Sequence, residues 1–361
     1  MLPLQAVTPA ALAAAVPGVR LEEARKLVAM VHRGMPVAAG SAVRRSAAEA
    51  VRAAGAVPEL QLVAEAASAL DPFVKYVFES AGARFETVRI PLEHPDRFSV
   101  CVSSQVGCAL ACAFCATGRL GLARNLAAWE IVEQVRAVRA RLPRGRVHGV
   151  VFQGMGEPLA NLDAVLDAIA VLTEPCALGI DARAITVCTA GLPAGIRRLA
   201  RAAPKVRLGV SIASAREAQR RALMPITERH ALADVIAAVA EHARATGLAP
   251  MWAVTLLDGV NDSDADADAL VELVRGFVAD TGIRPRLSIL AYNAIGGPAA
   301  SGSGGAVGGG AASGHVIDPF ARSPREAAFR ARLSAAGLPS HRRYSGGADI
   351  AAACGQLAAA R

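Results

Sequence analysis

Long apolar runs and a secretory signal are both missing from this sequence. No uninterrupted apolar run approaches the ~18 residues that a membrane span requires, so we expect no membrane partner. The opening stretch from Met1 to Val16 is apolar but lacks the basic start of a secretory signal. We therefore expect a cytoplasmic protein, in which the seven cysteines are reduced thiols, metal ligands or catalysts.

Aromatic residues are also scarce, at 4% of the chain, whereas hydrophobic residues reach 53% and many of these are alanine. This composition is typical of a helix-rich globular protein. Lysine and arginine number 39 against 31 acidic residues, which gives a net charge of +8. A moderate basic excess is compatible with a nucleic-acid partner, although many soluble proteins share it.

Strand and helix patterns alternate from residue 99 onward and predict an α/β fold with a parallel sheet, either open or barrel-like. The predicted strands are 99–102, 148–152, 184–188, 207–212, 251–257 and 286–292, and the predicted helices are 127–140, 162–172, 194–202, 231–246, 265–281 and 324–336. Residues 1–75 are expected to form a helical accessory domain, followed by ribbon strands at 76–80 and 85–90. The core then spans 76–295, and 296–361 combines a flexible loop at Gly296–Gly314 with a C-terminal segment.

Four of the seven cysteines fall between Cys101 and Cys115. Cys108, Cys112 and Cys115 are spaced so that three thiolates can surround one compact metal centre. A four-iron cluster normally takes four cysteines, so three leave one iron open. An open iron can chelate the amino and carboxylate groups of S-adenosylmethionine (SAM). Two alternatives are structural zinc on these thiols with Cys101, for which the spacing is awkward, and reduced core cysteines.

The triplet with Phe114 resembles the radical SAM signature, and the wider string Cys101–Gly118 resembles a narrower family. That family is the radical SAM RNA (adenine carbon-2) methyltransferases, which act on large-subunit ribosomal RNA and in part on transfer RNA. The similarity continues through Gly154–Leu159, Leu257–Asp262 and Asp349–Leu357. It implies a partial (β/α)6 barrel, a 4Fe-4S cluster, SAM, an RNA substrate and an electron-donor protein.

The same resemblance implies two further active cysteines. Cys354 would accept a methyl group from one SAM, and a second SAM, cleaved at the cluster, would remove a hydrogen from that methyl. After addition to carbon 2 of adenine, Glu86 would accept the proton. Cys101 would then form a transient disulfide with Cys354 and release the product. Without the resemblance, we expect Glu86 to lie in an edge strand with its side chain exposed to solvent.

The resemblance also implies a set of SAM contacts. These are Gly156, Glu157, Cys188, Ser211, Ile212, Ala213 and Asn293. A carboxylate such as Glu157 can pair with the ammonium of SAM, and glycines allow close backbone approach. Without the resemblance, Ser211 and Asn293 would be ordinary turn residues after strands.

This chain departs from the family at several of these positions. Cys188 replaces a serine, Ala213 replaces a histidine that contacts SAM, and Gly346 replaces an arginine. These departures affect substrate contacts and part of the SAM pocket, and they leave the cluster cysteines, Cys101, Glu86 and Cys354 in place. The alternatives are a radical SAM enzyme of the same ancestry acting on another RNA position or on a non-RNA substrate, and a non-catalytic binding protein. Four arginines near the motifs are either RNA contacts or solvated charges: Arg119, Arg124, Arg342 and Arg343.

Overall fold

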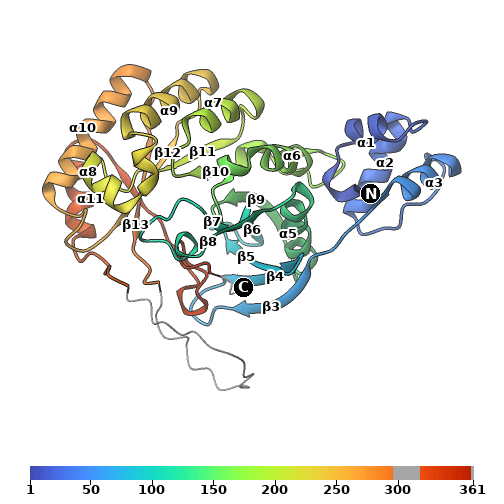
Figure 1. The fold of residues 1–361 in the computed structure, drawn as a ribbon, viewed down its shortest axis with the longest axis horizontal. Helices are drawn as coiled ribbons and strands as arrows, with labels where there is room; N and C mark the ends of the chain where they lie inside the picture. Colours follow the sequence, from blue (N-terminus) through green and yellow to red (C-terminus); the bar gives the residue numbers. More distant parts are fainter. Residues whose placement is uncertain (296–317, 359–361) are drawn as a thin grey trace.

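Six parallel strands alternate with six helices in the computed structural model, which describes residues 1–295 and 318–358. The strands lie side by side in the order β13-β12-β11-β10-β9-β6, and Figure 1 shows the helices outside them. The partial barrel predicted from the sequence is confirmed. Its elements are β6 (Arg97–Val102), α5 (Ala128–Ala140), β9 (Arg146–Phe152), α6 (Leu162–Thr173), β10 (Ile185–Thr189), α7 (Pro193–Ala202), β11 (Arg207–Ser211), α9 (Leu232–Thr246), β12 (Met251–Leu256), α10 (Asp264–Thr281), β13 (Arg286–Ala291) and α11 (Glu326–Ala335).

Local signals fix the ends of the barrel helices. Ser263 caps α10, since its hydroxyl accepts from Asp266 N and the Asp266 carboxylate accepts from Ser263 N. Gly282 and Gly247 end α10 and α9 in the left-handed conformation, which glycine adopts at little cost. The chain therefore turns back to the next parallel strand at defined positions.

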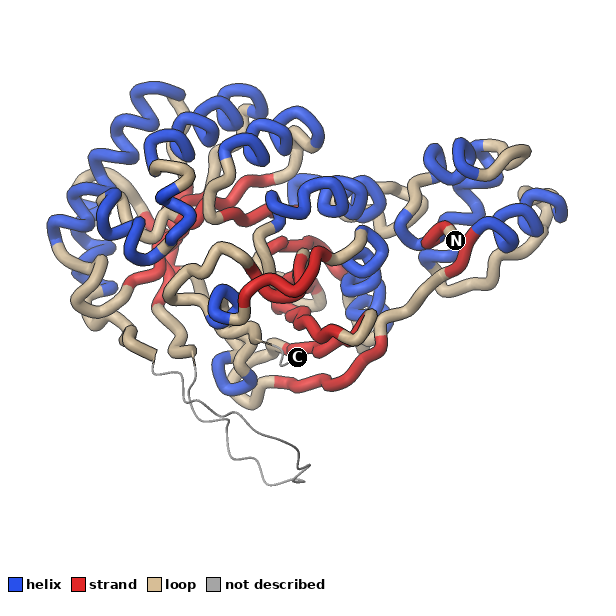
Figure 2. Tube along the Cα trace, in the orientation of Figure 1, coloured by secondary structure: helices blue, strands red, loops and turns tan. Residues whose placement is uncertain are grey.

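The sheet continues past the barrel on both sides. On one side β5 (Ala83–Pro91), β4 (Val74–Ser80) and β3 (Gln61–Ala67) add antiparallel strands, and on the other β14 (Ser340–Arg342) adds a parallel one. Figure 2 shows β3 curving along the lower margin of the molecule. Glu86 was expected in an edge strand, and this is wrong: β5 lies between β4 and β6, and Glu86 is buried.

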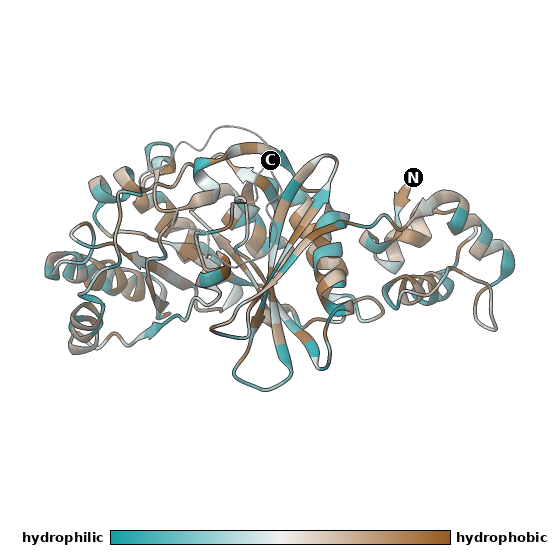
Figure 3. Ribbon diagram, turned by 90° about the horizontal axis from the view of Figure 1, so that it is seen from below, coloured by the Kyte–Doolittle hydropathy of each residue, from teal (hydrophilic) through white to brown (hydrophobic). Residues whose placement is uncertain are grey.

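The N-terminal helices pack around a small core of their own. They are α1 (Pro9–Ala15), α2 (Leu21–His32) and α3 (Arg45–Ala54), with a short pairing of β1 (Leu2–Pro3) and β2 (Gly55–Ala56). Figures 1 and 3 both show this part to one side of the barrel. The last N-terminal helix ends at Ala54, and the next long element, β3, already belongs to the main sheet. The division of the chain at residue 75 stays a prediction.

Short elements cover the carboxyl ends of the barrel strands. They are β7 (Gln105–Cys108), α4 (Ala116–Arg119), β8 (Gly121–Asn125) and α8 (Glu217–Leu223). The predicted flexible loop Gly296–Gly314 lies outside the described residues. Over residues 1–295 and 318–358, no helix has both the length and the apolar character needed to cross a bilayer.

Candidate active site

The cysteine loop is held between the β7–β8 hairpin and α4. Cys108 ends β7, and Cys115 precedes α4. The loop is closed by a hydrogen bond from Cys115 N to Cys112 O of 3.1 Å and fixed to α8 through Ala113 N and Leu223 O at 2.9 Å. Gly118 packs against the backbone of Cys112. A Cβ at position 118 would lie 2.9 Å from Cys112 N, so a larger residue would displace the loop.

The three loop thiols are half-buried beside apolar side chains. Burial raises the pKa of Cys108 to about 11, and it also raises the pKa values of Cys112 and Cys115. The charge of the fully buried Arg220 opposes this rise at Cys112. A bound cationic centre would therefore be needed to hold all three as thiolates at neutral pH.

Among residues 1–295 and 318–358, no three His, Cys, Asp or Glu side chains converge closely enough to hold one metal ion. A cubane cluster differs, because each iron takes a single protein thiolate and the sulfurs stay farther apart. Cys101 lies within β6 with Cys354 and Cys188 as its thiol neighbours, so it does not complete the zinc set considered from the sequence.

One pocket brings the loop together with residues from four barrel strands and the C-terminal tail. We call it the cysteine pocket; its lining includes Cys108, Cys112, Cys115, Gly156, Glu157, Cys188, Ser211, Ala213 and Cys354. Most of the residues predicted from the sequence to serve the cluster or SAM therefore lie on one surface. The pocket opens at the carboxyl ends of the strands, as expected for a barrel enzyme.

Glu157 is buried on the pocket wall and already has backbone partners. Its Oε1 accepts from Leu159 N at 3.0 Å, and its Oε2 accepts from Ala190 N at 2.8 Å. Burial raises its pKa to about 6, and these hydrogen bonds oppose the rise. The carboxylate thus ties the loop after β9 to the end of β10, and Glu157 is among the residues that line the pocket.

The walls formed by β10 and β11 follow the alternation of a strand. Ser211 and Ala213 face the pocket, whereas Ile212 between them is fully buried in the main core. Ala213 adopts a left-handed φ of 58°, and its carbonyl accepts from Asn261 Nδ2 at 2.7 Å. Cys188 Sγ lies 3.7 Å from Gln153 Oε1, and burial raises the pKa of this thiol to about 11.

A hydrogen-bond clamp fixes the backbone of Cys354. Cys354 N donates to Ser345 Oγ at 2.8 Å, and Asn293 Nδ2 donates to Cys354 O at 3.1 Å. Asn293 Nδ2 also reaches Ser345 Oγ at 3.2 Å, which joins the two halves of the clamp. Asn293 was predicted to contact SAM, and here its amide is used to hold the tail.

The tail after Cys354 runs from the cysteine loop to Glu86. Gly355 O accepts from Ala116 N at 2.7 Å, and farther along Ala358 N donates to Glu86 Oε2 at 2.7 Å. The other Glu86 oxygen pairs with Lys75 Nζ at 3.0 Å. Glu86 is therefore close to the tail, but both of its oxygens are already in use.

Cys101 is buried next to Cys354 but not bonded to it. All seven cysteines are free thiols in this structure. Burial raises the pKa of Cys101, the Cys354 thiol adds to the rise, and the charge of Arg343 opposes it. Within the described part of the chain, Arg343 Nη1 is buried without a hydrogen-bond partner.

The other arginines nominated from the sequence are engaged within the protein. Arg124 pairs with Glu130, Arg119 with Asp318, and Arg342 with Glu326. Each acidic partner is more buried than its arginine, which is typical of structural pairs.

Sequence reasoning missed Ser345 and Asn261. It also missed that the charge of Arg343 acts on the Cys101 thiol. Asn261 belongs to a motif that the sequence did reveal, so a buried amide after a strand was a usable signal. Ser345 carries no comparable local signal, because its partner Asn293 is 52 positions away.

Comparison with known proteins gives consistent matches. The family model of the radical SAM superfamily matches residues 102–274. A "Probable RNA methyltransferase" of Sorangium cellulosum is 60% identical over 349 residues, 94% of this chain and 88% of that protein. The "Dual-specificity RNA methyltransferase RlmN" of Syntrophobacter fumaroxidans is 41% identical over 290 residues, which are 79% of this chain and 76% of that protein. A crystal structure of a radical SAM methyltransferase from Sphaerobacter thermophilus superimposes with a TM-score of 0.82 at 35% identity, over 99% of both chains.

Proposed function

Because the chain belongs to the radical SAM family of RNA methyltransferases, we propose that it methylates carbon 2 of an adenine in RNA through a methyl group carried on Cys354. Ribosomal RNA is the first substrate to test, and transfer RNA is the second. The observation that carries the proposal is that Cys354 shares the cysteine pocket with Cys108, Cys112 and Cys115. A carrier thiol and a cluster must share one pocket if a radical formed at the cluster is to act on the carried methyl group.

The donor set suits a 4Fe-4S cluster on the three loop cysteines. Leu110, Phe114 and Met224 line the same pocket and would limit water around the sulfurs. A cluster held there by Cys108, Cys112 and Cys115 would, with SAM bound beside it, supply a carbon-centred radical. Gly156 and Glu157 lie across the pocket, where a carboxylate can pair with the ammonium of SAM.

Cys354 takes the role of methyl acceptor. Its thiolate attacks the methyl carbon of SAM, so that a sulfur–carbon bond forms as the methyl–sulfonium bond breaks. The clamp of Ser345 and Asn293 restricts where this sulfur can lie, since it holds both backbone polar groups of the residue. Such restriction is the usual contribution of a protein to a displacement reaction.

Glu86 and Cys101 complete the reaction. Glu86 is ion-paired with Lys75 through Oε1, and Ala358 N must leave Oε2 before that oxygen can take a proton. Cys101 then attacks Cys354 Sγ and forms a disulfide as the bond from sulfur to the adduct carbon breaks. That carbon takes up a proton to become the methyl group, and the adduct gives up the one electron that SAM cleavage consumed. Proton transfer to Glu86 therefore depends on movement of the tail at Ala358.

The test is a Cys101→Ala variant, reconstituted with iron and sulfide and incubated with RNA, SAM and a chemical reductant that stands in for the electron-donor protein. We expect RNA to remain covalently attached to Cys354, detected as a nucleotide adduct by mass spectrometry of the digested protein. Cys354→Ala serves as the control and should trap none. Turnover of Cys101→Ala at the wild-type rate would contradict release through Cys101. A methyl group mapped to another RNA position would favour the alternative substrate.

A further inference from the structure

In the described part of the chain, no lysine or arginine is among the residues that line the cysteine pocket. Of the arginines nominated from the sequence, Arg119, Arg124 and Arg342 are ion-paired within the protein, and Arg343 has a buried guanidinium nitrogen. A protein that binds RNA needs accessible cations for the phosphate backbone, because those contacts supply most of the affinity. With a net charge of +8, the chain must present unpaired cations elsewhere.

Three depressions carry such cations: two lie between the N-terminal part and the barrel, and the third lies on the barrel alone. All three are lined by Arg139, near the end of α5. One lies between the end of α2 and α5, the second lies between α2 and the turn at residues 174–178, and the third lies between the start of β9 and residues 178–181. We call them together the basal groove; its exposed basic residues are Arg25, Lys26, Arg33, Arg139, Arg141 and Arg146.

The charges in the basal groove are poorly neutralised. Within residues 1–295 and 318–358, Arg25, Lys26, Arg33 and Arg139 take part in no ion pair. Five acidic side chains also line the groove: Glu22, Glu59, Glu133, Glu174 and Asp181. Glu133 is paired with Arg136, and the other four keep their charge. With Arg136 included, the basic side chains of the lining exceed the acidic ones by two.

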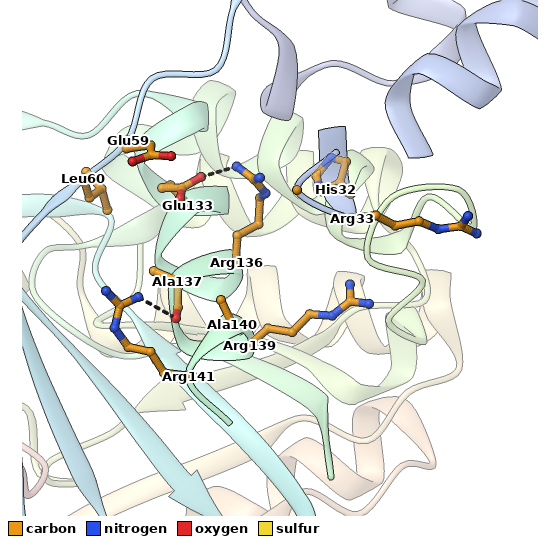
Figure 4. Close-up of a pocket in the computed structure, with 11 residues that line it drawn as sticks. His32, Arg33, Glu59, Leu60, Glu133, Arg136, Ala137, Arg139, Ala140 and Arg141 are labelled. Carbon is orange, nitrogen blue, oxygen red and sulfur yellow. Dashed lines mark hydrogen bonds and ion pairs between the residues drawn. The ribbon is translucent and has the colours of Figure 1, made fainter. Parts of the chain in front are cut away.

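The paired and unpaired arginines point in different directions. Figure 4 shows Arg136 turned toward Glu133, while Arg33 and Arg139 extend away from that pair. The Arg136 guanidinium also donates to Val31 O at 2.9 Å, so it joins the N-terminal part to α5. Arg136 therefore builds the groove, and Arg33 and Arg139 are left to bind a ligand.

The basal groove lies at the opposite end of the barrel from the cysteine pocket. Arg146 begins β9, whereas Gly156 and Glu157 follow its end. The seven residues of β9 span about 23 Å at 3.3 Å per residue. A ligand that reaches both places must be a long polymer and not a single nucleotide.

We propose that the basal groove binds the phosphate backbone of the RNA substrate at a point remote from the target adenine. Guanidinium groups suit this role, because their planar donors can meet two phosphate oxygens at once. The inference rests on RNA being the substrate, but not on the chemistry assigned to Cys354, Cys101 or Glu86.

The test compares two matched double variants that lose the same charge. Arg33→Gln with Arg139→Gln alters the basal groove, and Arg201→Gln with Arg284→Gln alters exposed arginines outside it. Binding of a fluorescein-labelled RNA hairpin long enough to span the barrel is measured by anisotropy from 50 to 200 mM salt. Two phosphate contacts contribute about 1.4 to 1.8 to the slope of log affinity against log salt. Wild type should therefore lose about seven- to twelvefold more affinity over this range than the groove variant.

The control variant should keep the wild-type slope, and SAM cleavage without RNA should be unchanged in both. Equal slopes for the two double variants would overturn the proposal. An equal loss of affinity for a trinucleotide too short to leave the cysteine pocket would also overturn it, because only a long RNA reaches the groove. If the hairpin binds as expected but carries no methylated adenine, the proposed chemistry fails and the groove stands.

Discussion

Removing the hydroxyl of Ser345 should misplace the Cys354 thiol without disturbing the barrel. In Ser345→Ala, Cys354 N loses its acceptor at 2.8 Å and Asn293 Nδ2 loses one of its two acceptors. Each such hydrogen bond contributes about 0.5–1.5 kcal/mol net, so the tail is held less firmly by about 1–3 kcal/mol. Small misplacements of a reacting group lower its rate by up to about a hundredfold. We therefore expect Cys354 methylation to slow by roughly ten- to a hundredfold.

The assay is the rate at which SAM methylates Cys354, followed by intact-protein mass spectrometry. Ser345→Thr keeps the oxygen and should retain most of the rate. Ser334→Ala, an exposed serine on α11 whose hydroxyl has no recorded partner among the described residues, is the matched control. Methylation of Ser345→Ala at the wild-type rate would refute the positioning role of the clamp.

Three further changes test other parts of the account. Arg124→Met leaves the buried Glu130 without its partner and should lower the free energy of unfolding by about 2 kcal/mol, while RNA affinity stays unchanged; a loss of affinity alone would make Arg124 an RNA contact. Burial lowers the pKa of His242 to about 4, so its neutral form stabilises the fold above pH 6.5 and that stability is lost toward pH 4. In His242→Leu, the free energy of unfolding measured by urea titration should therefore lose about 3 kcal/mol of its change between pH 6.5 and pH 4. An unchanged pH profile would be evidence against the lowered pKa of His242. Gly118→Ala places a Cβ 2.9 Å from Cys112 N and should reduce iron content after reconstitution; full iron incorporation would show that the loop tolerates the shift.

Local patterns were sufficient to predict the barrel. Its strands are short apolar runs, and the helices between them carry recognisable caps such as Ser263, so each unit is encoded within a few tens of residues. β3 was missed because most of its residues are exposed and it has no apolar alternation to detect. The burial of Glu86 was mispredicted for a related reason, since it depends on β3 and β4 extending the sheet beside β5.

In the candidate site, too, residues that are close in the sequence could be predicted, and contacts between distant positions could not. Cys108, Cys112 and Cys115 sit in one loop, so their spacing alone revealed them. The contact between Ala358 and Glu86 joins positions 272 apart, and no local pattern can encode such a pairing. The alternation at the end of β11 directs the Ile212 side chain into the core while Ser211 and Ala213 face the pocket, and the SAM contact expected of Ile212 stays a prediction.

Anaerobic reconstitution with iron and sulfide tests the central claim most directly. Wild type should take up about four irons and four sulfides per chain, and added SAM should change the electron paramagnetic resonance signal of the reduced protein. A variant with alanine at Cys108, Cys112 and Cys115 should take up neither. Zinc without iron, or an iron signal that SAM leaves unchanged, would contradict the assignment of these thiols to a radical SAM cluster.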